Sequence, residues 1–215
     1  MVPNSRICVP VAVSTSSSRP SSEPPLQAMF AARKRVFVDL LHWDVPVLEG
    51  CYEVDQFDDG YAEYLIVGGE DGRHLASTRL LETTRPHILD SLFPQLCASS
   101  PPHGREVREI TRFCLDPSGG ALARREARNV LVSALVEHAL VNGIRTYTGV
   151  AELGWLQQIL AFGWRCRPLG LPLKVGAQTL GALAITITSE TPALLAANGI
   201  FRPTTLLSPR ALEAA

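Results

Sequence analysis

The stretch Arg108-Glu109-Ile110-Thr111-Arg112-Phe113 lies just past the midpoint of a 215-residue chain. Apolar and β-branched residues separate and flank its charges, which indicates a β-strand more than a helix. Glu109 and Arg112 therefore carry opposite charges into a core-like element. Because a charge removed from water costs free energy unless it is paired or has a task, this stretch is either a structural ion pair or part of a functional site.

The composition indicates a soluble globular protein that is long enough to bury a sizeable core, with 46% hydrophobic and 19% charged residues. The formal net charge of -1 offers no general attraction to nucleic acid or to an anionic membrane, so neither is a predicted partner. The five cysteines are scattered and lack C-x-x-C spacing, so no disulfide framework and no metal site is predicted. No apolar run reaches the roughly 18 residues of a membrane span, and the Met1 end has no secretory signal. We predict a cytoplasmic protein.

Three regions follow from the distribution of residue types along the chain. Ser, Pro and Thr dominate residues 14–25 and cannot bury enough apolar surface to become ordered, so residues 1–25 are predicted as a flexible Ser/Pro-rich N-terminal segment. Residues 26–200 are predicted as a single domain. Residues 201–215 are predicted as a C-terminal tail.

Strand and helix patterns alternate along the predicted domain. Helices are predicted over 26–41, 122–141 and 153–162, with a short helix or turn in 88–93. Strands are predicted over 61–67, 74–81, 145–150 and 174–187, and the first two are joined by a glycine-rich hairpin turn. This alternation predicts an α/β (α+β) fold in which helices cover a mixed sheet.

An acidic run stands apart from these elements. It spans residues 49–60 and contains Glu53, Asp55, Asp58 and Asp59. Most runs of this kind are solvated turns, and that is one interpretation here. The other is a site for a cationic ligand.

Several short motifs follow one another in a fixed order: Arg33, Phe37 and Trp43; then Glu53-Val54-Asp55-Gln56-Phe57-Asp58; then Thr78-Arg79-Leu80-Leu81; then Glu109-Ile110-Thr111-Arg112-Phe113. Their order and spacing, over about residues 26–200, resemble those of the acyl-homoserine-lactone synthases, the LuxI-type autoinducer synthases. The resemblance implies a fold similar to GNAT-type acetyltransferases, a three-layer α-β-α sandwich whose mixed sheet is splayed into a V.

The resemblance also implies a reaction of quorum-sensing signal production. The amine of S-adenosyl-methionine attacks an acyl thioester supplied by acyl carrier protein or by coenzyme A. The carboxylate of S-adenosyl-methionine then displaces the sulfonium, which closes the lactone and releases methylthioadenosine. S-adenosyl-methionine is thus a substrate, and no cofactor is implied.

The chemistry of this reaction explains the residue types in the motifs. An α-amine with a pKa of about 8 must lose a proton before it attacks, so a carboxylate base is needed. The predicted catalytic set is Glu109, Arg112 and Asp55. The predicted set for binding S-adenosyl-methionine is Arg33, Phe37, Trp43, Asp55, Asp58, Arg79, Arg112 and Phe113. Without the resemblance, the aromatic residues would be ordinary core residues and Arg33 a surface arginine.

The acyl group and its donor need surfaces of their own. Trp155, Leu156 and Ile159 are predicted to line an apolar acyl pocket. Arg124, Arg125 and Arg128 form either a basic surface for the acyl donor or a solvated helix face. Members of the family that make 3-oxo products often carry Thr or Ser where this chain has Gly149-Val150-Ala151-Glu152, so a product without a 3-oxo group is predicted.

Two other functions remain open from the sequence. One is a GNAT-like N-acyltransferase that acts on another amine, and the other is a catalytically inactive module that binds acyl chains. Asp55 and Asp58 argue against the first because they suit a cationic sulfonium substrate. The presence of both Glu109 and Arg112 argues against the second.

Overall fold

The computed structural model describes residues 9–15 and 23–207. One mixed sheet has the order β11-β1-β4-β5-β6-β7-β10-β8, and β9 pairs with β10. Its strands are β1 Val9–Thr15, β4 Glu63–Gly68, β5 His74–Glu82, β6 Val107–Leu115, β7 Thr146–Glu152, β8 Arg165–Pro168, β9 Leu173–Val175, β10 Gln178–Thr186 and β11 Thr204–Leu207. A separate hairpin consists of β2 Val47–Leu48 and β3 Tyr52–Glu53.

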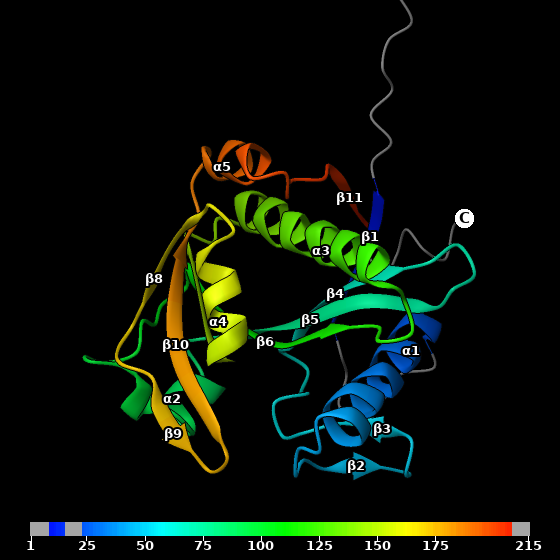
Figure 1. Cartoon of the computed structure of the whole chain (residues 1–215), viewed down its shortest axis with the longest axis horizontal. Coiled ribbons are helices and arrows are strands. Elements are labelled where there is room, and N and C mark those ends of the chain that lie inside the picture. The colour runs from blue at the N-terminus through cyan, green and yellow to red at the C-terminus, as the bar shows by residue number, and fades with distance from the viewer. Residues whose placement is uncertain (1–8, 16–22, 208–215) are drawn as a thin grey trace, which may run out of the picture.

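Helices cover both faces of this sheet. They are α1 Pro24–Arg33, which continues as the π-helical segment η1 Lys34–Leu40, α2 Ile88–Ser91, the 3-10 turn η2 Pro94–Leu96, α3 Ala121–Asn142, α4 Leu153–Leu160 and α5 Thr191–Ala197. Figure 1 shows α3 and α5 on one side of β4 and β5, with α1 on the other. The mixed sheet between two helical layers confirms the predicted α/β sandwich.

Helix α3 forms the largest part of the core. Its residues Ala127, Leu131, Ala134 and Leu135 recur at spacings of three and four and are buried against the sheet, as the sequence period predicts. The helix ends at Gly143, whose φ of 68° is the left-handed conformation that glycine adopts without steric cost. Its length carries the chain from β6 back to β7, and these two strands are therefore parallel.

Strands β6 and β7 pair over only part of their length. Val107–Ile110 of β6 pairs with Thr146–Gly149 of β7, and beyond Ile110 strand β6 follows β5 alone. The sheet therefore opens between the second half of β6 and the second half of β7. This split is the V-shaped arrangement that the family resemblance implies.

The predicted terminal segments are corrected in part. Residues 9–15, predicted as flexible, form β1, which pairs with β4 and β11. Val9, Val11 and Val13 alternate with smaller residues, a strand period that the Ser/Pro-rich run beside it obscures. Residues 204–207, predicted as tail, form β11. Helix α1 also begins at Pro24, within the segment predicted as flexible. The predictions on residues 1–8, 16–22 and 208–215 lie outside the described residues.

The C-terminal part differs from its prediction in three elements. The strand predicted over 174–187 is a hairpin of β9 and β10, and Gly176, with a φ of 59°, makes its turn. Strand β8 and helix α5 were not predicted, since both are short and polar at one end. In the described part of the chain, no helix has the length and apolar character needed to cross a membrane.

Candidate active site

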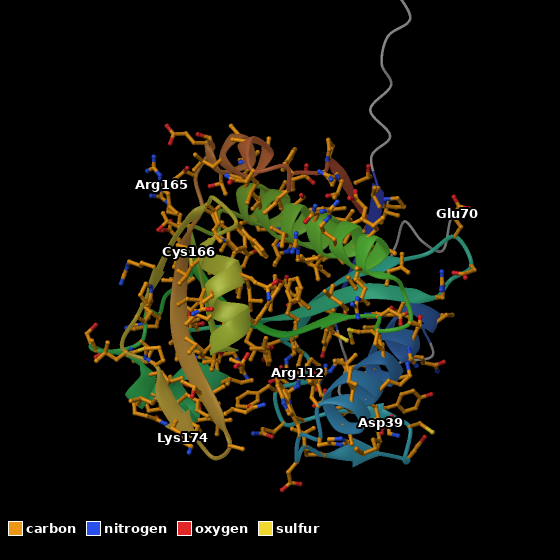
Figure 2. The ribbon with its side chains drawn as sticks, in the orientation of Figure 1. Asp39, Glu70, Arg112, Arg165, Cys166 and Lys174 are labelled. Carbon is orange, nitrogen blue, oxygen red and sulfur yellow. The ribbon has the colours of Figure 1, made fainter. Side chains whose placement is uncertain are left out.

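A cleft of about 1600 Å³ lies where β6 and β7 part. Both strands supply its walls, and so do η1, the segment after it, α2 and α4. Figure 2 shows Arg112 near the centre of the molecule, between the side that carries α1 and the side that carries α4 and β10. The cleft is lined by predicted site residues Phe37, Trp43, Asp55, Glu109, Arg112, Phe113, Trp155 and Ile159.

Three arginines and three carboxylates form a closed ring of alternating charge beside the cleft. Its order is Arg33, Glu53, Arg112, Asp55, Arg79, Asp58 and back to Arg33. Every neighbouring pair is within 3.0 Å, the longest separation being that between Arg112 and Glu53. Because each charge touches two of opposite sign, the buried ring is neutral as a whole.

The ring positions its members at different depths. Asp55 and Arg112 line the cleft, whereas Arg33, Asp58 and Arg79 are 1%, 5% and 0% exposed and do not line it. Burial places these last three behind the cleft lining, and their role in binding S-adenosyl-methionine stays a prediction. They hold Asp55 and Arg112 in place, and Arg79 extends this support through a hydrogen bond of 2.9 Å from its Nε to Thr111 Oγ1.

Arg112 reaches the ring because the strand is irregular at this residue. Its φ of 50° is uncommon for a residue with a Cβ atom, and the pairing of β5 with β6 shifts register next to it. A regular strand would alternate side chains between the faces. The bulge instead turns Arg112 toward Glu53 and Asp55, on the same side as Thr111.

The acidic run is not a solvated turn, because Glu53 and Asp58 are buried. Burial raises the pKa of a carboxyl, but Arg33 and Arg79 outweigh it at Asp58, and the pKa of Asp58 lies below its ordinary value. The pKa of Asp55 is also lowered, because Arg79 and Arg112 outweigh its burial. Both groups are therefore ionised at neutral pH and are weak bases.

Glu109 stands outside the ring. It is completely buried, and its two carboxylate oxygens accept hydrogen bonds of 2.8 and 2.9 Å from the backbone N–H groups of Ile88 and Leu89 at the start of α2. Desolvation raises the pKa of Glu109 to about 8, although those two hydrogen bonds oppose the shift. Glu109 and Arg112 are thus not an ion pair, and the interpretation of this stretch as a structural ion pair is corrected.

Two aromatic rings cover the exposed side of Arg112. Phe37 and Trp43 stack with their centroids 4.7 Å apart, and the Arg112 guanidinium lies 5.6 and 5.8 Å from the two centroids. Both rings line the cleft. Trp43 Nε1 is buried without a hydrogen-bond partner among the described residues, so a donor is available at this wall.

The other end of the cleft is an apolar lobe. Phe113, Trp155, Phe162 and Trp164 make successive ring contacts at 5.3, 5.8 and 5.7 Å between centroids. The predicted pocket residues Trp155 and Ile159 line the cleft here. Phe113, predicted to bind S-adenosyl-methionine, also belongs to this lobe.

Leu156, the third predicted pocket residue, is 3% exposed and is not among the residues that line the cleft. Its side chain packs over Gly181 of β10, where a Cβ atom would come within 2.7 Å of Leu156 Cδ2. Leu156 is therefore a core residue that fixes α4 against β10. A direct contact of Leu156 with the acyl group stays a prediction.

The three arginines predicted for the acyl donor differ in exposure. Arg124 and Arg125 are exposed in the first turn of α3, whereas Arg128 is half-buried. The Arg128 guanidinium lies 5.0 Å from the centroid of Phe162, which lines the apolar lobe. Burial and the nearby Arg125 lower the pKa of Arg128, and none of the three arginines is among the residues that line the cleft.

Sequence reasoning missed three side chains that shape the site. Glu53 joins Arg33 to Arg112, and Thr111 binds Arg79. Thr148 is completely buried and lines the cleft, and no hydrogen-bond partner for its hydroxyl is present among the described residues. The pairing of Thr148 with Glu109 across two parallel strands could be anticipated only once the register was known.

Comparison with solved structures supports the fold. A coenzyme A-dependent acyl-homoserine lactone synthase, BjaI, solved with SAM and isopentyl-CoA, aligns with a TM-score of 0.77 and 28% identity over 92% of each chain. An acyl-CoA N-acyltransferase from Pseudomonas aeruginosa aligns with a TM-score of 0.54 and 14% identity over 81% of this chain and 97% of that one, which indicates a common fold. The GNAT-like fold is thereby confirmed.

Relatives identified by sequence define the family more narrowly than the shared fold does. The acyl-homoserine-lactone synthase of Ralstonia solanacearum is 30% identical over 76% of this chain and 82% of that protein. The isovaleryl-homoserine lactone synthase of Bradyrhizobium diazoefficiens is 30% identical over 79% of this chain and 76% of that protein. The family model described as autoinducer synthase matches residues 18–193. The chain therefore belongs to the autoinducer synthase family.

Proposed function

We propose that this protein is an acyl-homoserine-lactone synthase, which transfers an acyl group from a thioester to the amine of S-adenosyl-methionine and closes the lactone. The observation that carries the proposal is the cleft itself. It joins a charged end, with Asp55, Arg112 and Glu109, to an aromatic and apolar end that suits an acyl chain. A site for acetyl transfer alone would not need the second lobe.

The roles follow from the charges at the cleft. Arg112 offers a cation to the carboxylate of S-adenosyl-methionine, and Asp55 offers an anion to its ammonium and sulfonium groups. Phe37 and Trp43 form an aromatic wall that suits stacking with adenine and cation–π contact with the sulfonium. Since the buried partners of Asp55 and Arg112 fix both groups before substrate arrives, little reorganisation is required.

Glu109 is the general base in this proposal. Its pKa of about 8 matches that of an α-amine, which favours proton transfer from the ammonium near neutral pH. The free amine then attacks the thioester carbon, a C–N bond forms, the C–S bond breaks, and the thiolate leaves with a proton. In the second step the substrate carboxylate attacks its own γ-carbon, the C–S⁺ bond breaks, and methylthioadenosine leaves neutral.

The proposal is tested by incubating the protein with S-adenosyl-methionine and a panel of acyl-CoA and acyl carrier protein thioesters. Chromatography should detect methylthioadenosine and an acyl-homoserine lactone in equal amounts. Thiol release without methylthioadenosine would instead identify an acyltransferase for another amine. Acyl-chain binding with neither product would identify an inactive module. We place the reaction in the cytoplasm, and the free cysteines of the described residues support this placement.

The basic surface formed by Arg124, Arg125 and Arg128 is proposed to receive the acyl donor, coenzyme A or acyl carrier protein, because both carry phosphate or acidic groups. A double change of Arg124→Glu and Arg125→Glu should raise KM for the donor about tenfold, the effect of roughly 1.4 kcal/mol, and leave kcat unchanged. Steady-state kinetics at low and high salt checks this, since the difference should shrink with salt. Arg165→Glu, at an exposed pair with Glu190, is the matched control. Equal KM values in all three proteins would exclude this surface.

The product is expected to lack a 3-oxo group. Tyr147 and Ala151 of β7 pack into the core of the α3 side, so the intervening Gly149 presents no hydroxyl to the apolar lobe. Thr148 points to the opposite face. Mass spectrometry of lactones from cells that express the protein should find mainly unsubstituted chains, and a predominant 3-oxo lactone would contradict this prediction.

A further inference from the structure

Thr148 is a cleft residue whose buried hydroxyl is not explained by packing alone. It is 0% exposed, yet its Oγ1 has no hydrogen-bond partner within the described ranges 9–15 and 23–207. A buried hydroxyl without a partner costs free energy, and valine would fill the same space without that cost. Because Thr148 also lines the cleft, the missing partner is expected to be a ligand.

The position of Thr148 is tied to that of Glu109. The two residues are paired in register on the parallel strands β6 and β7. Neighbouring strands lie about 4.8 Å apart, and side chains paired in register stand on the same face. Both indeed face α2, because Glu109 accepts a hydrogen bond from the N–H of Leu89, and Val150, two residues after Thr148, packs with Leu89. No hydrogen bond joins the Thr148 hydroxyl to the Glu109 carboxylate, although both residues line the cleft.

We infer that the Thr148 hydroxyl donates a hydrogen bond to the thioester carbonyl oxygen and to the oxyanion that it becomes. The inference rests on the proposed acyl transfer. When Glu109 takes a proton from the ammonium, the amine nitrogen lies against the carboxylate, and the carbonyl carbon lies about 3 Å beyond it. The carbonyl oxygen then comes near the paired residue on the next strand. The attack forms the C–N bond and moves the C=O π electrons onto this oxygen.

In this step Thr148 donates a hydrogen bond and transfers no proton. The proton of Thr148 stays on its own oxygen throughout, and the hydrogen bond strengthens as negative charge develops. When the C–S bond breaks, its electron pair leaves on the sulfur and the electrons on the oxyanion return to form the amide C=O. The nitrogen, positively charged after the attack, loses its second proton to the leaving thiolate, and the proton first taken by Glu109 passes to solvent. The hydroxyl acts in a water-poor cleft, where a fixed donor stabilises an oxyanion far better than in water.

The test compares Thr148→Val, which keeps the shape and removes the hydroxyl, with Thr148→Ser, which keeps the hydroxyl. The probe is isovaleryl-CoA with S-adenosyl-methionine, and methylthioadenosine is measured. If the parent is inactive with this probe, the most active acyl-CoA of the panel replaces it. Thr186→Val, an exposed threonine on β10, is the matched control.

Thr148→Val should lower kcat by roughly 10²–10³-fold, as the loss of one oxyanion donor does, with KM for the acyl donor nearly unchanged. Thr148→Ser should keep kcat within about tenfold. The unfolding midpoint of Thr148→Val should equal or exceed that of the parent, since a costly buried group is removed.

Three results would overturn the inference. They are a kcat of Thr148→Val close to that of the parent, a Thr148→Ser variant as slow as Thr148→Val, or a lower midpoint for Thr148→Val, which would mean that the hydroxyl is paired inside the protein. None of them would touch the proposed function. That function fails only if the parent releases no methylthioadenosine with any donor of the panel.

Discussion

Glu109→Gln is expected to lower kcat by roughly 10²–10⁴-fold, the range typical of a lost general base. The change leaves the shape of the side chain intact but removes the group that takes the proton of the ammonium. The expected loss is in kcat more than in KM, because the base acts in the transition state. Steady-state formation of methylthioadenosine measures both constants. Turnover within a few-fold of the parent would remove Glu109 from this role.

The pH dependence distinguishes the base from a structural residue. With a pKa raised to about 8 by burial, Glu109 should make kcat rise with pH up to about 8 and level off above it. In Glu109→Gln the residual kcat should lack this ionisation. The same pKa shift predicts that the free energy of unfolding falls with rising pH, whereas kcat rises. The contribution of Glu109 to stability is fully present below its pKa in the unfolded chain, about 4.3, and is lost as pH rises through its folded pKa of about 8. The free energy of unfolding of Glu109→Gln should therefore depend less on pH between these two values than that of the parent.

Glu190→Gln is the control for Glu109→Gln. Glu190 is exposed, pairs with Arg165 and is not among the residues that line the cleft. Its loss should leave kcat, KM and the pH profile of the parent within about twofold. A similar fall in both variants would mean that the loss at Glu109 does not come from the chemistry.

Asp58→Asn is expected to lower the free energy of unfolding by about 3–5 kcal/mol, the cost of breaking a buried ion pair from one side. Asp58 accepts two hydrogen bonds from Arg33 and one from the hydroxyl of Tyr64, and it also contacts Arg79. Its loss leaves the buried ring with one net positive charge. Urea unfolding measures the change, and Glu190→Gln, in an exposed pair, should cost only about 0–1 kcal/mol.

Acid sensitivity offers a second measure of the ring. Because the pKa of Asp58 is lowered in the folded protein, its contribution to stability is present above about pH 4 and is lost as pH falls below that value. Asp58→Asn should therefore unfold with a smaller dependence on pH below about 4 than the parent. An unfolding free energy of Asp58→Asn equal to that of the parent at pH 7 would show that the ring adds nothing to stability.

Much of the fold follows from local sequence patterns. The spacing in α3 predicts a buried helical face, and the glycines after β4 predict the hairpin to β5. These elements are long and strongly periodic, so local pattern and tertiary packing agree. Strand β1 has a short local strand period, but its partners β4 and β11 are distant in sequence, and no local pattern predicts these pairings.

The site was predicted as a set of residues but not as an arrangement. The motifs identify Arg33, Asp55, Asp58, Arg79 and Arg112 together, and all five meet in one ring. Their depth could not be predicted, because burial depends on how the acidic loop packs against two strands that are distant in sequence. The turn of Arg112 toward Glu53 and Asp55 likewise depends on a bulge, which the alternation of a regular strand does not encode.

The charge ring also has a consequence for the order in which the chain folds. Its six members come from α1, the acidic loop after it, β5 and β6, so no single hairpin or helix of the chain contains a balanced set. Glu53, Asp55 and Asp58 of the acidic run gain little free energy by docking before the arginines of β5 and β6 are in place. Burying either of these arginines without its carboxylates would also cost free energy. We expect the charged wall of the cleft to assemble in one cooperative step, after β5 and β6 have paired. An intermediate with a half-formed binding site should therefore not accumulate.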